Sequence, residues 1–219
     1  MSILIENVEI YGWGAAIRGM RNPMNSWDKS DTINGECYGK DENGNYILVD
    51  YDVPEIGQND LDLMKRLVNA GTDHAKFMRM IGVSLDVVAP LYWWKEFDTY
   101  KIGTVANSCS TMHKIHDKEF TLDDFSHEHL KGAWEDTLLI LISLLNLSRR
   151  HFNETKGKEF WWEMIQLLPS SYNQRRTVTL NYAVLKNIFQ ARREHKLDEW
   201  RDFCKWIETL PYSELITGG

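Results

Sequence analysis

Two arginines, Arg18 and Arg21, lie three residues apart in a short segment that also carries hydrogen-bonding side chains and a tryptophan. Guanidinium groups make charge-assisted hydrogen bonds to anions, so this composition suits an anionic or nucleotide ligand. The alternative is that both arginines follow one helix face and pair with acids from Asp28 and Asp31. Either interpretation places them on a short helical turn that Pro23 limits.

A second group of candidate residues lies in the C-terminal third. Steps of three and four residues link Asn181 to Arg192 through Leu185 and Ile188. On one helix these residues share a face, so Asn181 and Arg192 are predicted to face the same cavity, with Asn187 partly round the helix. Arginine offers five fixed donors and a permanent charge. The alternative is that Arg192 ends the helix and complements its dipole.

The sequence lacks the motifs of metal sites and phosphate-binding loops. His113 and His116 lie three residues apart, and His127 and His129 two apart, without a cysteine pair or carboxylate at ligand spacing. The glycines match neither a Walker loop nor a dinucleotide fingerprint. No histidine–aspartate arrangement accompanies Cys109, which favours a buried or ligand-lining thiol over a nucleophile. We expect no metal.

Composition and charge narrow the class of partner. The 219 residues include 32 acidic and 25 basic side chains, which give a formal net charge of −7. A nucleic-acid surface needs concentrated positive charge, so we expect no nucleic-acid partner, whereas a small anionic ligand is compatible. The three cysteines lack paired spacing, no signal-peptide pattern is seen, and the longest apolar run is about half of a membrane span. We therefore expect a reduced, cytoplasmic protein without a membrane partner.

Hydrophobic periodicity predicts the elements that position these residues. Strands are expected at Ile3–Tyr11, Tyr46–Val53 and Val83–Tyr92, with Pro90 marking an edge or a bend, and a loop is expected at Asp28–Asn45. Lys76–Ile81 fits a helix or a strand. Helices are expected from Asn59 to Gly71 and at Glu128–Phe152, Phe160–Leu167, Gln174–Arg192 and Leu197–Leu210. No linker separates two halves, so we predict one domain over residues 1–219.

The segment 89–113 resembles the flavin-dependent thymidylate synthase family. In that family an apolar strand with a proline leads into an Arg-His-Arg signature, which a serine follows seven or eight residues later. Here Thr99-Tyr100-Lys101 stands at the triplet, and the serine position falls at Cys109 or Ser110. Of the signature, only a charge at Lys101 is preserved.

The C-terminal third matches the same family more closely. Its proline, two asparagines and arginine are reproduced without a gap by Pro169, Asn181, Asn187 and Arg192. The resemblance implies that the two asparagines help to hold the flavin and that the arginine binds and activates the pyrimidine. Two further arginines and a histidine of the family are replaced here by Ala183, Ile165 and Lys196.

The resemblance implies a fold and a role for each candidate residue. The fold is α/β, a single thymidylate synthase-like domain with a central mixed or antiparallel sheet and a helical C-terminal half. FAD would contact Asn181, Asn187, His74, Tyr100, Lys101 and Thr104. The pyrimidine nucleotide would contact the catalytic Arg192 together with Glu96, Asn107, Cys109, Ser110, Arg18 and Arg21.

An active protein of this family would methylate C5 of a uridylate, converting dUMP to dTMP. Methylenetetrahydrofolate would be the carbon donor, reduced FAD the cofactor and NADPH the reductant. The resemblance also implies a homotetramer with sites where subunits meet. Two alternatives stay open: the same scaffold acting on another pyrimidine nucleotide, and a protein that sequesters a nucleotide without turnover.

Overall fold

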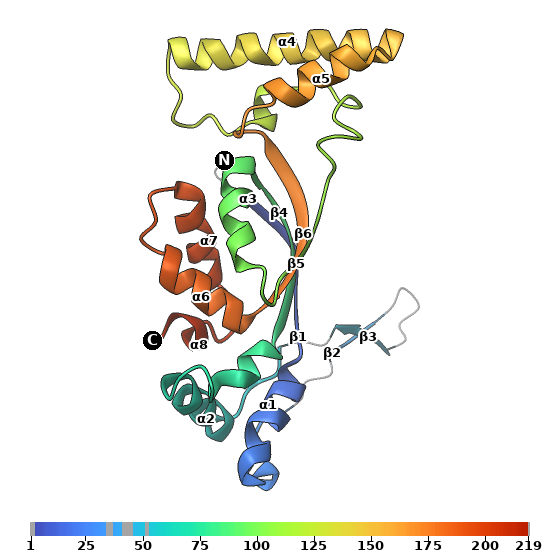
Figure 1. Cartoon of the computed structure of the whole chain (residues 1–219). Helices are drawn as coiled ribbons and strands as arrows, with labels where there is room; N and C mark the ends of the chain where they lie inside the picture. Colours follow the sequence, from blue (N-terminus) through green and yellow to red (C-terminus); the bar gives the residue numbers. More distant parts are fainter. Residues whose placement is uncertain (1–2, 34–36, 41–45, 51–52, 219) are drawn as a thin grey trace. The chain divides into compact units, whose positions relative to one another are not determined.

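The computed structural model describes residues 3–33, 37–40, 46–50 and 53–218 (Figure 1). Within them the chain has the predicted mixed α/β fold. The α-helices are α1 (Trp13–Arg21), α2 (Gln58–Asn69), α3 (Leu91–Phe97), α4 (Ala133–Thr155), α5 (Lys158–Leu167), α6 (Tyr182–Arg192), α7 (Asp198–Glu208) and α8 (Glu214–Thr217). The strands are β1 (Leu4–Tyr11), β2 (Cys37–Lys40), β3 (Tyr46–Asp50), β4 (Gly82–Pro90), β5 (Val105–Ser108) and β6 (Asn173–Asn181). In the described part of the chain, no helix is long and apolar enough to cross a membrane.

Four strands form an antiparallel sheet in the order β1-β4-β6-β5, and β2 pairs with β3 in a separate antiparallel hairpin. The predicted strand at the N-terminus is confirmed as β1. The predicted strand Tyr46–Val53 is confirmed as β3 up to Asp50, and residues 51–52 lie outside the described residues. The predicted loop Asp28–Asn45 is wrong at Cys37–Lys40, because pairing with β3 makes a strand of a short segment in which Gly39 and Lys40 disfavour one. Its residues 34–36 and 41–45 lie outside the described part.

Strand β4 shows the alternation that predicted it. Val83, Leu85 and Val87 are buried, while Ser84 and Asp86 between them are half-buried. Pro90 is the last residue of β4 and directly precedes α3. Because β4 lies inside the sheet, the proline marks its end and not an edge strand, and the predicted extension of this strand to Tyr92 is wrong, since α3 begins at Leu91.

The predicted helix Gln174–Arg192 is wrong in its first half, which forms strand β6, and right in its second, which forms α6. Val178 and Leu180 are buried, whereas Thr177 and Thr179, which precede each of them, are not, which is a two-residue period. The ambiguous segment Lys76–Ile81 is mostly a 3₁₀-helix, η3 (Ala75–Arg79). The other predicted helices are confirmed, with starts that differ by up to five residues.

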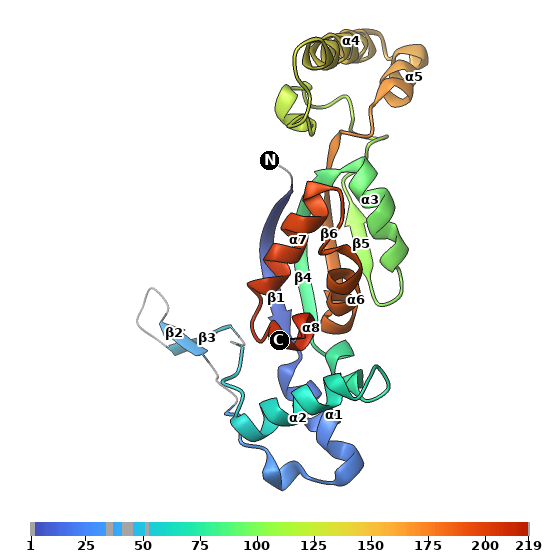
Figure 2. The same ribbon diagram turned by 90° about the vertical axis from the view of Figure 1, so that its left-hand side faces the viewer.

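The chain forms two compact units whose segments alternate along the sequence. Unit 1 comprises Met1–Glu6, Asp86–Thr99 and Ala106–Val178. In it α4 and α5 lie side by side (Figures 1 and 2). They share a core of Ile115, Phe120, Phe125, Leu138, Ile142, Leu145 and Met164. That all 219 residues form one domain stays a prediction.

Unit 2 comprises Asn7–Leu85, Tyr100–Val105 and Thr179–Gly219. Helix α6 packs against α7, α8 and η3 (Figure 2). Leu185 and Ile188 of α6 are fully buried, as are Trp200 and Phe203 of α7. This buried side of α6 fixes the helix, so its opposite side is left to form a wall of the site described next.

Candidate functional site

Unit 2 contains a cavity of about 600 Å³ beside α2, η3, the loop at residues 102–103 and α6. We call it the α6 cavity. Its lining residues are Val68, Gly71, Thr72, Ala75, Met78, Arg79, Ile102, Gly103, Asn181, Ala183, Val184, Lys186, Asn187 and Gln190. The volume lies within the range of small-molecule sites, about 300–1,000 Å³.

The wall of the α6 cavity combines three kinds of side chain. Ala75, Met78 and Val184 are buried and apolar. Thr72 and the three amides supply neutral polar groups, and Arg79 and Lys186 supply two positive charges. Among the lining residues that the structure describes, none is Asp or Glu. This composition suits a ligand with an apolar ring and an anionic group.

Asn181 lies where β6 ends and α6 begins. It is the N-cap of α6, and its Oδ1 accepts a hydrogen bond from the backbone N of Val184 at 3.1 Å. The capping bond uses the amide oxygen, and in the described part of the chain Nδ2 has no hydrogen-bond partner. The structure therefore places a fixed donor of the predicted flavin-binding Asn181 in the wall of the cavity, with Asn187 in the same wall.

The loop that follows Tyr100 closes one side of the α6 cavity. The backbone N of Thr104 donates to the carbonyl of Lys101 at 3.3 Å, and Gly103 has φ +81°, which favours glycine. A Cβ on Gly103 would lie 3.1 Å from Cγ2 of Val184 and 3.2 Å from Nδ2 of Asn181. The glycine thus lets the loop approach the cap of α6 closely. Next to it, the hydroxyl of Thr104 is buried without a hydrogen-bond partner among the described residues.

Arg192 lies at the C-terminal end of α6 against two aromatic rings. Its Nε donates to the hydroxyl of Tyr100 at 3.0 Å, and its guanidinium carbon lies 4.8 Å from the ring centroid of Trp200. A guanidinium over an indole gains cation–π energy. The hydrogen bond and the ring together fix the orientation of Arg192, so its charge is preorganised.

Arg192 and Asn181 do not line the same cavity, contrary to the prediction from helical spacing. Asn181 is a cap and not part of the helix, so the three- and four-residue steps do not begin there. Within α6, Arg192 follows the buried Leu185 and Ile188, whereas Asn187 belongs to the face that lines the α6 cavity. The loop at residues 100–103 contacts both places, through Tyr100 at one end and Gly103 at the other.

The positive charge of Arg192 acts electrostatically on the thiol of Cys204 in α7. Burial, with a smaller contribution from Glu208, raises the pKa of this thiol to about 11 against the opposing effect of Arg192. At neutral pH the thiol is protonated, so Cys204 is not a nucleophile.

Arg21 has protein partners for its guanidinium and is 4% exposed. Its Nε donates to Oδ1 of Asp60 at 2.6 Å, and its Nη1 donates to the carbonyl of Ser26 at 3.1 Å. The open alternative of an arginine paired with an acid is therefore the better interpretation, although the acid is Asp60. Arg18 is exposed on α1, and its contact with a nucleotide stays a prediction.

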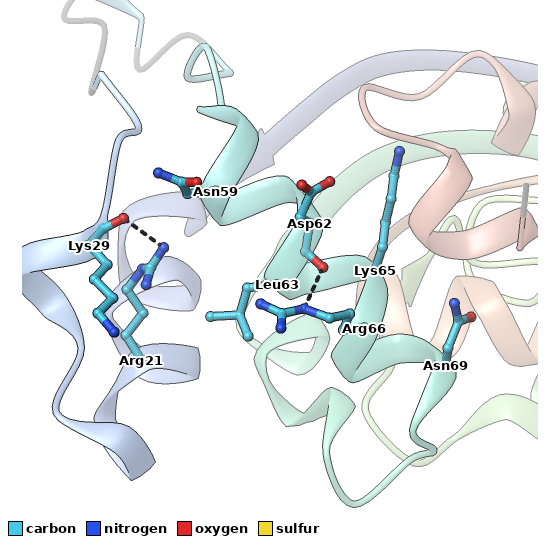
Figure 3. A pocket seen from close by; sticks show the side chains of 8 residues that line it. All are labelled: Arg21, Lys29, Asn59, Asp62, Leu63, Lys65, Arg66 and Asn69. Atoms are coloured by element: carbon cyan, nitrogen blue, oxygen red, sulfur yellow. Dashed lines mark hydrogen bonds between the residues drawn. The ribbon is translucent and has the colours of Figure 1, made fainter.

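A second cavity of about 600 Å³ lies beside α2, lined by Arg21, Lys29, Asn59, Asp62, Leu63, Lys65, Arg66 and Asn69 (Figure 3). Its cations are largely engaged by protein groups. Nη2 of Arg21 donates to the carbonyl of Lys29 at 3.0 Å, and Nε of Arg66 donates to that of Asp62 at 3.4 Å. Lys65 Nζ lies 3.5 Å from Oε1 of Glu214. This cavity is therefore a weaker candidate for an anionic ligand than the α6 cavity.

The other predicted site residues lie outside the lining of the α6 cavity. His74 and Lys101 are exposed in segments that contribute to its wall. Four belong to unit 1, namely Glu96, Asn107, Cys109 and Ser110. The hydroxyl of Ser110 accepts from the backbone N of His113 at 2.9 Å, which stabilises a turn. Cys109 is exposed, so the interpretation as a buried thiol is wrong. The ligand contacts of these residues stay predictions.

Apart from Thr72, which lies two residues before the predicted His74, three polar residues of the α6 cavity were not predicted from the sequence: Arg79, Lys186 and Gln190. Gln190 lies three residues after Asn187 and Lys186 three after Ala183, so both follow from helical spacing once α6 begins at Tyr182. Arg79 had no such signal, because η3 fits neither period.

No family model matches the chain, and no curated protein does. Solved structures share its fold. The flavin-dependent thymidylate synthase ThyX from Helicobacter pylori, complexed with FAD and dUMP, matches with a TM-score of 0.66 and 15% identity over 99% of this chain and 97% of that chain. A second crystal structure of that enzyme with FAD and dUMP matches equally, over 99% and 96%.

The UMP/dUMP methylase PolB from Streptomyces cacaoi, bound with 5-Br dUMP, shares the fold as well. It matches with a TM-score of 0.63 and 14% identity over 100% of this chain and 96% of that chain. The fold implied by the sequence resemblance is thereby confirmed. At 14–15% identity these matches show the fold alone.

Proposed function

We propose that this chain is an FAD-dependent enzyme that methylates C5 of a uridylate, converting dUMP to dTMP. The observation that carries the proposal is the α6 cavity, whose wall contains Asn181 and Asn187, the two asparagines that the family resemblance assigns to the flavin. Support comes from the shared fold, since the H. pylori enzyme was solved with FAD and dUMP and PolB is a UMP/dUMP methylase.

The residues of the α6 cavity fit a flavin nucleotide. An isoalloxazine ring needs an apolar surface and hydrogen-bonding groups at its edge, which Met78, Val184 and the amide of Asn181 provide. Nδ2 of Asn181, which has no hydrogen-bond partner among the described residues, can donate to the edge of such a ring. When bound, the flavin supplies the redox chemistry, for which protein side chains are unsuited.

Arg192 is the residue proposed to act on the pyrimidine. Its preorganised guanidinium would donate to the O2 or O4 edge and stabilise the negative charge that develops there when C5 reacts as a nucleophile. Tyr100 would position it through the bond to Nε. Methylenetetrahydrofolate as carbon donor and NADPH as reductant belong to the proposal, as does a cytoplasmic location.

We expect a homotetramer, and α4 supplies its physical support. Trp134, Ile140, Leu144 and Leu147 of this helix are 73%, 62%, 47% and 40% exposed. A row of exposed apolar side chains favours burial against another protein surface. Light scattering on the purified protein should give the mass of four chains, and the charged variant Ile140→Asp should give smaller species. A monomeric wild type would contradict this expectation.

Absorbance and tritium release test the proposed function. The purified protein, or the protein after addition of FAD, should be yellow. Methylation replaces the hydrogen on C5 with a methyl group, so it should also release tritium from C5-labelled dUMP when methylenetetrahydrofolate and NADPH are added. Flavin binding with release from UMP alone would favour the alternative pyrimidine substrate. A protein that binds dUMP but stays colourless in FAD would instead be a sequestering protein.

A further inference from the structure

We infer that Arg79 and Lys186 bind the phosphate groups of a nucleotide whose ring occupies the α6 cavity. The inference that this nucleotide is FAD rests on the proposed function. The inference that it carries phosphate rests on the charges and contacts of the cavity itself.

The two cations of the α6 cavity lack a carboxylate partner. Among the described residues, neither Arg79 nor Lys186 makes an ion pair, and none of the described lining residues is acidic. The chain as a whole has a net charge of −7, so a cavity with two positive and no negative side chains differs sharply from the average surface. A phosphate bears the charge that would complement it.

Lys186 occupies a position in which its charge is costly without an anion. It is half-buried on α6, one helical turn after Ala183, whose small side chain leaves space in the same wall. Burial lowers the pKa of the Lys186 ammonium. An anionic ligand near this ammonium would offset the desolvation of the charged form.

Neutral groups of the cavity are arranged to bind the rest of a nucleotide. Asn187 and Gln190 lie on the same side of α6 as Lys186 and offer amide donors and acceptors. Ile102 lines the cavity and yet is 94% exposed, so an apolar side chain is available at the rim to cover a planar ring. A ligand with a ring and a phosphate chain would contact the apolar and amide side chains through its ring and the two cationic side chains through its phosphates.

The test compares ligands that differ in phosphate. Binding of FAD, riboflavin and ADP is measured by titration calorimetry for wild type, Lys186→Ala and Arg79→Ala. Each variant should bind FAD and ADP at least tenfold more weakly, because a charge-assisted contact is lost, while riboflavin affinity changes less than twofold. Lys186→Arg should retain most of the affinity for FAD.

Matched controls separate the local contact from net charge. Lys196→Ala and Arg150→Ala remove the same charges from exposed positions outside the cavity and should leave all three affinities unchanged. Equal weakening of riboflavin and FAD, or no weakening, would overturn the inference, as would a wild type that binds neither FAD nor ADP. A wild type that binds ADP but no flavin, with the loss seen in both variants, would reject the proposed flavoenzyme and retain the phosphate site.

Discussion

Replacing Asp60 with alanine should lower the free energy of unfolding by about 3–5 kcal/mol, because it leaves the buried Arg21 charge without its partner. Asp60 is fully buried and Arg21 is 4% exposed. The Asp60 carboxylate accepts from Nε of Arg21 at 2.6 Å, and its other oxygen accepts from Oγ of Ser30 at 2.7 Å and from Oγ1 of Thr32 at 2.6 Å. One carboxylate therefore holds α1, α2 and the segment between them together.

Urea unfolding followed by circular dichroism measures this effect. Asp62→Ala is the matched control, since Asp62 is exposed on the same helix, and it should change the unfolding free energy by about 0.5 kcal/mol or less. The double variant Asp60→Leu with Arg21→Met removes both charges and should recover only part of the loss, because the backbone N–H groups of Asp31 and Thr32 then lack the carboxylate that accepts from them. If Asp60→Ala were no less stable than the control, the Arg21–Asp60 pair would not contribute to the stability of the fold.

The same pair predicts a dependence of stability on pH. Burial raises the pKa of Asp60, but hydrogen bonds from Thr32, Ser30 and Arg21 outweigh burial and lower it below its ordinary value. A carboxyl group whose folded pKa is lowered stabilises the fold above its unfolded pKa, about 3.9, and loses this contribution as pH falls through the folded pKa. The difference between wild type and Asp60→Asn should therefore shrink below about pH 4.

Local hydrophobic patterns in the sequence predicted most helices and strands. They failed where the two-residue period of a strand runs directly into the 3.6-residue period of a helix. β4 alternates clearly, and the helices of the C-terminal half repeat at the helical period. At β6 and α6 a strand runs directly into a helix, with Asn181 as the last residue of one and the cap of the other. Helical spacing counted across that boundary placed Asn181 and Arg192 on one face.

The candidate site could be predicted only as far as its residues follow from one element. Asn187 belongs to α6, and its neighbours on that face can be counted from it. Arg79 and Gly103 reach the cavity through tertiary packing of separate segments. Likewise the partner of Arg21 is Asp60, 39 residues away, and not the acids that follow it closely. Such long-range pairs depend on how elements pack, which no local pattern contains.

Replacing Arg192 with alanine should weaken binding of dUMP at least tenfold and lower tritium release from its C5 by about a hundredfold, if the guanidinium stabilises charge in the transition state. Arg193→Ala is the matched control. Both residues end α6, so a role in complementing the helix dipole would cost the two variants similar stability. Arg193 is exposed, and only Arg192 contacts Tyr100 and Trp200.

Calorimetry with dUMP and steady-state kinetics distinguish binding from orientation at Arg192. Arg192→Lys keeps the charge but loses the planar donors and the contact with Trp200, so it should restore little. Tyr100→Phe removes only the hydroxyl that accepts from Nε; it should lower kcat more than it raises KM, because the charge is still present but no longer held in one orientation. Unchanged dUMP affinity in Arg192→Ala would show that this arginine does not bind the nucleotide. Equal losses of dUMP affinity and activity in Arg192→Ala and Arg193→Ala would show that both residues only stabilise the C-terminal end of α6.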